Sequence, residues 1–297
     1  MSLPTQPDAY SFTRYLSAKR SVDDRALNRH VYAALQSHVT AQLAALDRPL
    51  AVLEIGAGIG TMVDRLLAWN LFGDQRDGVH YTALDAEADN ISTAQARLAS
   101  RPEWLSLRLV TEDALAFAQR PEQQQYDLLI AHAVLDLLDM DRALPLLRRL
   151  LRPDGSFYFT INFDGATILQ PAIDPSFDTL IAAAYHDTMD TRIVDGLPSG
   201  DSCTGRHLFS TLPAHGFRIA AAGSSDWVVH AIDGEYPEDE RYFLHFIVQT
   251  MAGALRDHPH IDARAFADWI KQRHEQVSRG ELIYIAHQLD FFGIAGS

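Results

Sequence analysis

Short apolar runs alternate with helical patterns through the middle of the chain. The apolar runs cover residues 50–55, 80–84, 105–110, 126–131 and 156–162. Buried parallel strands read as nearly continuous apolar runs, whereas helices repeat an apolar residue every three or four positions. The alternation therefore predicts an α/β fold with a doubly wound, mostly parallel sheet and helices on both faces.

Helical periodicity also marks the start of the chain. Residues 11–47 are predicted to be helical, because apolar residues recur at helical spacing from Val31 to Leu43. We therefore expect an N-terminal helical segment over residues 1–48, followed by the main domain over residues 49–297.

The alternation loosens beyond residue 164. Residues 164–203 contain several Pro and Gly and no clear strand, and residues 234–279 are mostly helical in pattern with a break at His258-Pro259. We expect both stretches to be insertions in the main domain. The other elements expected here are a helix from about residue 202 to 216 and strands at 217–222, 227–230 and 281–286.

A glycine-rich turn carries the strongest chemical signal. Residues 52–61 read Val-Leu-Glu-Ile-Gly-Ala-Gly-Ile-Gly-Thr, a strand, a turn and a helix start. Glycine permits a sharp turn and close approach of a ligand to bare backbone. The spacing is G-x-G-x-G, with Thr61 where the dinucleotide fingerprint has its third glycine. Glu54, just before the turn, is a poor neighbour for a pyrophosphate and a good one for a cationic ligand.

The order of motifs resembles the class I (Rossmann-like) S-adenosylmethionine-dependent methyltransferases. After the glycine turn come Asp85 at the end of the second strand, Glu112-Asp113-Ala114, the strand at 126–131 and Leu-Arg-Pro-Asp-Gly at 151–155, a turn by composition. The resemblance covers about residues 50–165. It implies a seven-stranded sheet, S-adenosyl-L-methionine as cofactor with S-adenosyl-L-homocysteine as product, and an N-terminal helical cap over the cofactor.

The resemblance also assigns roles to individual residues. Asp85 would bind the ribose hydroxyls, Asp113 and Ala114 the adenine edge, and Glu54 the amino-acid end through a neighbour or water. A helix cap is the alternative role for both aspartates. The cofactor-binding residues expected are Glu54, Gly56, Ala57, Gly58, Gly60, Asp85, Ala86, Glu112, Asp113, Ala114 and His132.

The methyl acceptor is expected beyond the carboxyl ends of the strands, where open α/β sheets bind their ligands. His132 and Asp164 are the candidate catalytic residues, although a buried histidine more often has a purely structural role. The candidate substrate-binding residues are Asn162, Tyr185, His186 and Arg206. Arg25 or Arg29 could pair with the cofactor carboxylate, or the helix that carries them could simply present a solvated face.

Composition narrows the partners. The net charge is −14 and basic residues do not cluster, which argues against nucleic acid and anionic lipid. Cys203 is the only cysteine, and the histidines match no metal motif, so we expect no metal. No apolar run is long enough for a membrane span and the first ten residues do not form a signal peptide, which indicates a cytoplasmic protein.

Together these features predict an S-adenosylmethionine-dependent methyltransferase that acts on an oxygen or nitrogen of a small polar molecule. A non-catalytic S-adenosylmethionine-binding protein or sensor is the main alternative, and a homodimer is left open. An aminopropyl transferase is disfavoured, because residues 131–134 read Ala-His-Ala-Val and lack the acidic pair of that group. The missing third glycine disfavours a dehydrogenase.

Overall fold

The computed structural model of the chain describes residues 6–7, 9–73, 78–121, 125–194 and 196–296. Residues 1–5 and 8 of the expected N-terminal segment therefore lie outside the described residues.

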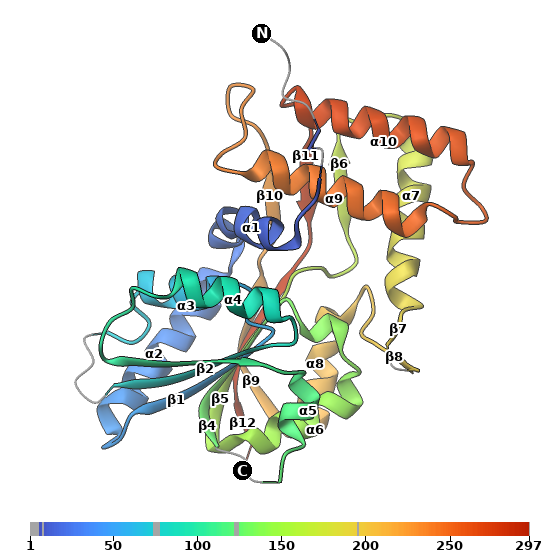
Figure 1. Ribbon diagram of the computed structural model, residues 1–297. Helices are drawn as coiled ribbons and strands as arrows, with labels where there is room; N and C mark the ends of the chain where they lie inside the picture. The colour runs from blue at the N-terminus through green and yellow to red at the C-terminus, as the bar shows by residue number, and fades with distance from the viewer. Residues whose placement is uncertain (1–5, 8, 74–77, 122–124, 195, 297) are drawn as a thin grey trace.

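A seven-stranded sheet forms the lower half of the molecule as drawn in Figure 1. Its strand order is β3-β2-β1-β4-β5-β12-β9, and β12 is antiparallel to both of its neighbours while the others run parallel. The strands are β1 (Leu50–Ile55), β2 (Val79–Asp85), β3 (Leu105–Thr111), β4 (Tyr126–His132), β5 (Leu151–Ile161), β9 (Phe217–Ser224) and β12 (Leu289–Ala295).

Helices cover both faces of this sheet. Alternate side chains of β1 enter two different cores, since Val52 packs with α2, α3 and α4 while Leu53 packs with α5, α6 and α8. These helices are α2 (Arg29–Ala45), α3 (Thr61–Ala68), α4 (Ala88–Arg97), α5 (Ala114–Ala118), α6 (Met140–Leu150) and α8 (Thr204–Ala214), with a 3-10 turn, η1 (Leu135–Leu137), between β4 and α6. The expected doubly wound architecture is confirmed.

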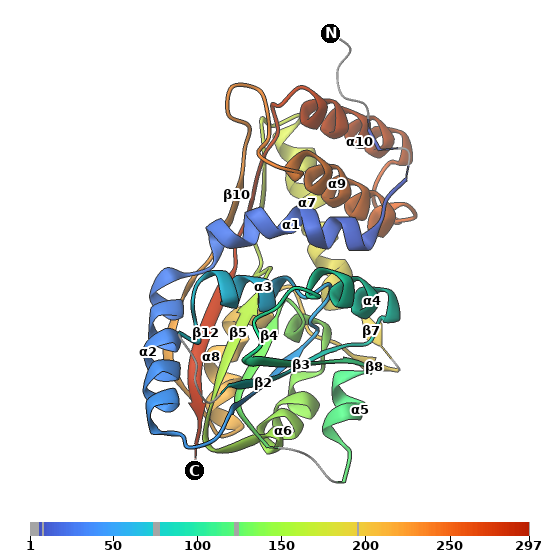
Figure 2. The ribbon, with the colours of Figure 1, turned by 60° about the vertical axis from the view of Figure 1, so that its left-hand side comes forward.

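A second layer stands beyond the carboxyl ends of the parallel strands (Figure 2). It contains a small antiparallel sheet in the order β10-β11-β6, packed against helices from both ends of the chain. Its elements are α1 (Phe12–Ala26), β6 (Thr167–Gln170), α7 (Pro175–Asp190), β10 (Trp227–Val229), α9 (Glu240–Leu255), α10 (Ala263–Ser278) and β11 (Ile283–Ala286), and the short hairpin β7 (Ile193–Val194) and β8 (Leu197–Pro198) follows α7. Within the second layer, helix α1 is the element on the side that faces the main sheet in both views (Figures 1 and 2).

Three sequence expectations need correction. Residues 164–203, expected to lack a clear strand, contain β6, β7 and β8. They also contain α7, whose start is capped by Asp174 with a proline at the first helical position. The expected strands at 227–230 and 281–286 belong to the small sheet, and the last strand of the main sheet is β12. Residues 152–155, expected as a turn, continue β5 with a shift in register. In the part of the chain described here, no helix combines the length and apolar character needed to cross a membrane.

Candidate functional site

The glycine turn after β1 takes up the left-handed backbone that its sequence requires. Gly56, Gly58 and Gly60 have φ values of 63°, 55° and 78°. A Cβ atom on Gly56 would lie 2.7 Å from the Cβ of Val134 in the loop after β4, a distance that real side chains do not adopt. The turn therefore needs glycine both for its backbone angles and for its packing against the neighbouring strand end.

Asp85 at the end of β2 fixes the turn to the adjacent strand. Its Oδ2 accepts a hydrogen bond of 2.8 Å from the backbone N–H of Gly58. Its Oδ1 accepts from the Glu87 backbone at 2.9 Å and from Nδ2 of Asn90 at 3.0 Å. The carboxylate expected to bind a ribose is thus held in one orientation at the start of α4.

Glu54 lies almost fully buried on β1, with 1% of its surface exposed. Its Oε2 accepts a hydrogen bond of 2.6 Å from the hydroxyl of Tyr81 on β2. Burial raises the pKa of this carboxyl to about 8, against the lowering effects of the Tyr81 hydrogen bond and of nearby Arg65. In the ligand-free chain the group holds its proton at neutral pH, and a cation beside it would favour the charged form.

The end of β3 is more open. Oδ1 of Asp113 caps α5 by accepting from the backbone N–H groups of Leu115 and Ala116, at 2.9 and 2.8 Å. Oε1 of Glu112 lies 3.0 Å from Nε of Arg120. Asp113 is exposed, as is Ala86 after β2, so this end of the site faces solvent. The capping role expected as an alternative for Asp113 is present.

His132 at the end of β4 is buried and has partners on both ring nitrogens. The hydroxyl of Thr160 on β5 donates to Nδ1, and Nε2 donates to a carboxylate oxygen of Asp23 on α1 at 3.0 Å. Burial lowers the pKa of His132 to about 4, although Asp23 acts in the opposite direction. The imidazole is therefore neutral and held in one tautomer.

Asp23 is the centre of a buried charge cluster that the sequence reading missed. Nζ of Lys19 and Nη2 of Arg65 lie 3.5 and 3.7 Å from its Oδ2, and Nε1 of Trp227 donates to its Oδ1 at 2.9 Å. Burial alone would raise the pKa of Asp23, but the surrounding cations lower it below its usual value. The spacing of Lys19 and Asp23, four residues apart on one helix face, was the available signal.

Helix α1 also covers the glycine turn. A Cβ atom on Gly58 would lie 3.2 Å from Cδ1 of Leu16. Arg25, one of two cations suggested for the cofactor carboxylate, pairs instead with buried Glu240. Arg29, the other, stacks on the ring of Trp69 at 4.0 Å. Among the described residues, the cations beside the candidate site are Lys19 and Arg65, which both pair with Asp23.

Unpartnered polar groups gather on the acceptor side, beyond β4 and β5. Nδ2 of Asn162, Oδ1 of Asp136 and Nε of Arg192 are buried and make no hydrogen bond with any described residue. A second guanidinium nitrogen of Arg192 donates to the main-chain oxygen of Asp136 at 3.1 Å, so these two residues are neighbours. Burial raises the pKa of Asp136, while Arg192 lowers it.

Three tyrosines close this region from the second layer. Tyr15 on α1 stacks on Phe246 at a ring distance of 4.2 Å. Burial is the main cause that raises the pKa of Tyr15, and nearby Tyr284, Tyr185 and Asp136 raise it further. Burial likewise raises the pKa of Tyr185 to about 12. The tyrosine hydroxyls and the Asp136 carboxyl therefore lie within electrostatic reach of one another.

The remaining candidates have structural partners. Asp164 is buried, and it accepts from the backbone and from Nε of Arg206 at 2.8 and 2.9 Å. Nε2 of His186 lies 3.1 Å from Oγ1 of Thr167. These contacts join β6, α7 and α8 without involving the glycine turn. Among the described residues, no three or more His, Cys, Asp or Glu are arranged as a metal site.

Known proteins resemble both the sequence and the fold. Residues 53–157 match the family model described as a methyltransferase domain, and no curated protein matches the chain. A Bacillus halodurans C-125 protein assigned as a methyltransferase superimposes with a TM-score of 0.51 at 12% identity, covering 88% of this chain and 99% of its own. The cyclopropane synthase MmaA2 from Mycobacterium tuberculosis gives a TM-score of 0.46 at 13% identity, covering 97% and 100%.

Proposed function

We propose that the chain transfers the methyl group of S-adenosylmethionine to an oxygen or nitrogen of a small polar molecule. The basis is its methyltransferase domain, which has the class I fold. The observation that carries the proposal is the row of carboxyl groups at the ends of three adjacent strands. Glu54 belongs to β1, Asp85 ends β2 and Asp113 follows β3.

The chemistry of these residues fits S-adenosylmethionine. Glu54 is a buried carboxyl that accepts a hydrogen bond from Tyr81, and a cationic ligand nearby would stabilise its ionised form. Asp85 is already oriented to accept hydroxyl hydrogen bonds, and Asp113 with Ala114 offers an acceptor and a backbone at the solvent-facing end. Lys19 suits the carboxylate of the amino-acid end. The remaining cofactor contacts, as expected from the sequence, are with Gly56, Ala57, Gly58, Gly60, Ala86, Glu112 and His132.

When bound, the cofactor supplies a methyl group activated by a sulfonium. The protein then has to hold the acceptor close and in line, which lowers the barrier mainly through positioning. Asn162, Arg192 and Tyr185 are the groups we assign to that task, since they offer hydrogen-bonding capacity in a buried region. Unpartnered polar groups in a buried region favour a small polar acceptor.

Asp136 is the group best suited to take a proton from the acceptor. Its Oδ1 is buried without a hydrogen bond, and its raised pKa brings it nearer to neutrality, where general bases are most effective. Both nitrogens of His132 are engaged, so His132 acts as a positioning residue through Asp23. Asp164, saturated by Arg206, keeps the second layer in place.

Calorimetric titration with S-adenosylhomocysteine tests the cofactor part of the proposal. Asp85→Ala should weaken binding at least tenfold, because it removes both the ribose acceptor and the partner of the Gly58 backbone. Asp89→Ala is the matched control, since Asp89 is an exposed aspartate in the first turn of α4, the helix that follows Asp85. Absence of heat with the wild-type chain would refute the proposal.

The acceptor part is tested with methyl-labelled S-adenosylmethionine and fractionated small-molecule extracts. Asp136→Asn should lower kcat for the labelled product by about 100-fold, the lower range for loss of a general base, while S-adenosylhomocysteine still binds. A wild-type chain that binds S-adenosylhomocysteine and labels no small molecule would support the sensor alternative instead.

A further inference from the structure

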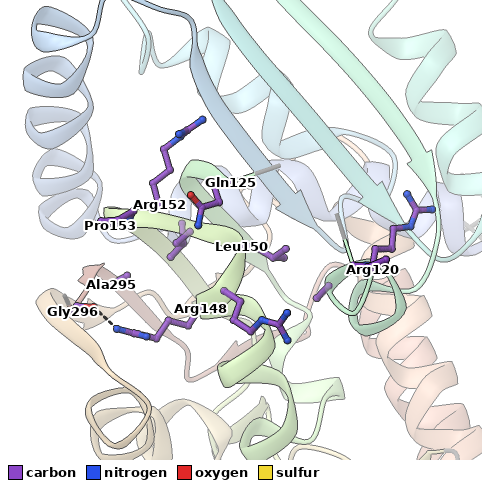
Figure 3. A pocket seen from close by; sticks show the side chains of 12 residues that line it. Arg120, Gln125, Arg148, Leu150, Arg152, Pro153, Ala295 and Gly296 are labelled. Carbon is purple, nitrogen blue, oxygen red and sulfur yellow. Dashed lines mark hydrogen bonds between the residues drawn. The ribbon is translucent and has the colours of Figure 1, made fainter. Parts of the chain in front are cut away.

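A cavity lies at the opposite edge of the main sheet from the glycine turn. It has a volume of about 520 Å³ and sits where β4 and β5 begin and β12 ends (Figure 3). We call it the arginine cavity. Its described lining includes Arg120, Gln125, Arg148, Arg149, Leu150 and Arg152.

The charge of this lining is opposite to that of the chain. The protein has 39 acidic and 25 basic residues, yet the described lining contains four arginines and no Asp or Glu. Figure 3 shows Gln125 and Leu150 between Arg120 on one side and Arg148 and Arg152 on the other. A cationic cavity in an acidic protein concentrates anions locally against the overall repulsion.

Only part of this positive charge is neutralised by described residues. Arg120 pairs with Glu112, which directly follows β3. Nε of Arg152 lies 3.4 Å from Asp127, whose two oxygens already accept bonds of 2.7 Å from both Nη atoms of Arg48. Asp127 is thus shared between two guanidinium groups, and Arg152 contributes excess positive charge.

The two arginines at the end of α6 have no carboxylate partner among the described residues. Arg148 donates to the main-chain oxygens of Gly216 and Gly296. Arg149 is exposed and makes no hydrogen bond or ion pair with a described residue. A helix C-terminus favours basic residues in its last turn, which accounts for part of this placement. It does not account for Arg120 and Arg152, which come from other segments.

We propose that the arginine cavity binds a small molecule that carries a phosphate group, at a site separate from methyl transfer. Its volume falls within the range of about 300–1,000 Å³ that small-molecule sites occupy. Guanidinium groups bind phosphate oxygens bidentately, and several cations around one cavity suit a group with more than one negative charge. Arg149 and Arg152 are the principal ligands, because Arg148 and Arg120 are already engaged.

Inorganic pyrophosphate is the probe, with binding to the full chain measured by calorimetry at 50 and 200 mM salt. We expect binding that weakens with salt and is reduced at least tenfold in the double variant Arg149→Ala/Arg152→Ala. Arg142→Ala is the matched control, because Arg142 is an exposed arginine of α6 that pairs with no described residue and lies outside the described cavity lining. Saturating S-adenosylhomocysteine should leave pyrophosphate binding unchanged.

Several outcomes would overturn the proposal. These are no pyrophosphate binding at 1 mM, full binding by the double variant, equal loss in Arg142→Ala, or displacement by S-adenosylhomocysteine. Citrate binding as tightly as pyrophosphate would refute the choice of phosphate. Salt-sensitive binding of a single-stranded RNA that is tighter than that of pyrophosphate, and that is lost in the same double variant, would show that the ligand is a nucleic acid and would refute the small-molecule proposal. None of these readouts requires methyl transfer.

Discussion

The buried carboxyl of Glu54 should make the stability of the ligand-free chain depend on pH in a defined way. Its pKa is about 8 in the folded chain, compared with 4.5 for an ordinary glutamate. Between these values the folded chain keeps a proton that the unfolded chain has released. Raising the pH through this interval therefore favours unfolding, until the folded-state carboxyl also ionises above about pH 8.

The size of the effect follows from the same shift. One pKa unit corresponds to about 1.4 kcal/mol, so between pH 6 and pH 8 this carboxyl alone should lower the free energy of unfolding by about 3 kcal/mol. Glu54→Gln removes the ionisation and keeps an oxygen that can accept from Tyr81. Relative to wild type, the variant should gain about 2 kcal/mol between pH 4.5 and pH 6 and about 3 kcal/mol more between pH 6 and pH 8.5.

Urea unfolding at pH 6, 7, 8 and 8.5 measures this difference. Asp290, whose pKa burial raises to about 7, adds the same pH dependence to both chains, so subtraction isolates Glu54. Tyr81→Phe removes a hydrogen bond that lowers the pKa of Glu54, and it should extend the loss of stability to higher pH. Parallel stability curves for wild type and Glu54→Gln would show that Glu54 is ionised in the folded chain and would refute the reasoning.

Two further predictions concern the elements around the turn. Asp23→Asn should cost about 3–5 kcal/mol of unfolding free energy, because it leaves buried Lys19 without its counter-charge while Arg65 keeps Asp24. It should also lower the pKa of His132 further, as NMR titration of the ring would show. Gly56→Ala should cost about 2–4 kcal/mol, from backbone strain together with overlap with Val134. Gly234→Ala, at a φ of 83° with nothing within 4 Å, should cost only about 1 kcal/mol, and equal losses in both glycine variants would contradict the packing argument.

The main sheet was predictable because local signals coincide with the fold there. Each buried parallel strand is an uninterrupted apolar run, and the glycine turn after β1 requires a backbone that few other residues adopt. The strand β12 was missed for a physical reason. It carries a buried Asp290 and a Gly293, two residue types that local preference excludes from strands.

Long-range contacts account for these two residues. Asp290 accepts hydrogen bonds of 2.7 Å from the backbone of Asn28 and the hydroxyl of Ser225, which are distant in sequence. A Cβ atom on Gly293 would lie 2.2 Å from the main-chain oxygen of Arg218 on the next strand. Neither contact can be inferred from the periodicity of apolar residues along the chain. No local rule could therefore have identified this strand.

The candidate site also contains a part that the sequence predicts and a part that it does not. The carboxyl groups lie at strand ends in the main domain, and their positions within sequence motifs were enough to predict them. Asp23, Lys19, Tyr15 and Tyr284 come from the two ends of the chain and meet only because α1 and the small sheet pack over the carboxyl edge. The proposed cofactor half of the site is therefore encoded locally, whereas the residues of the proposed acceptor half come together only in the folded chain. For this reason the sequence predicts the cofactor directly, and the acceptor class has to be inferred from buried, unpartnered groups such as those of Asp136.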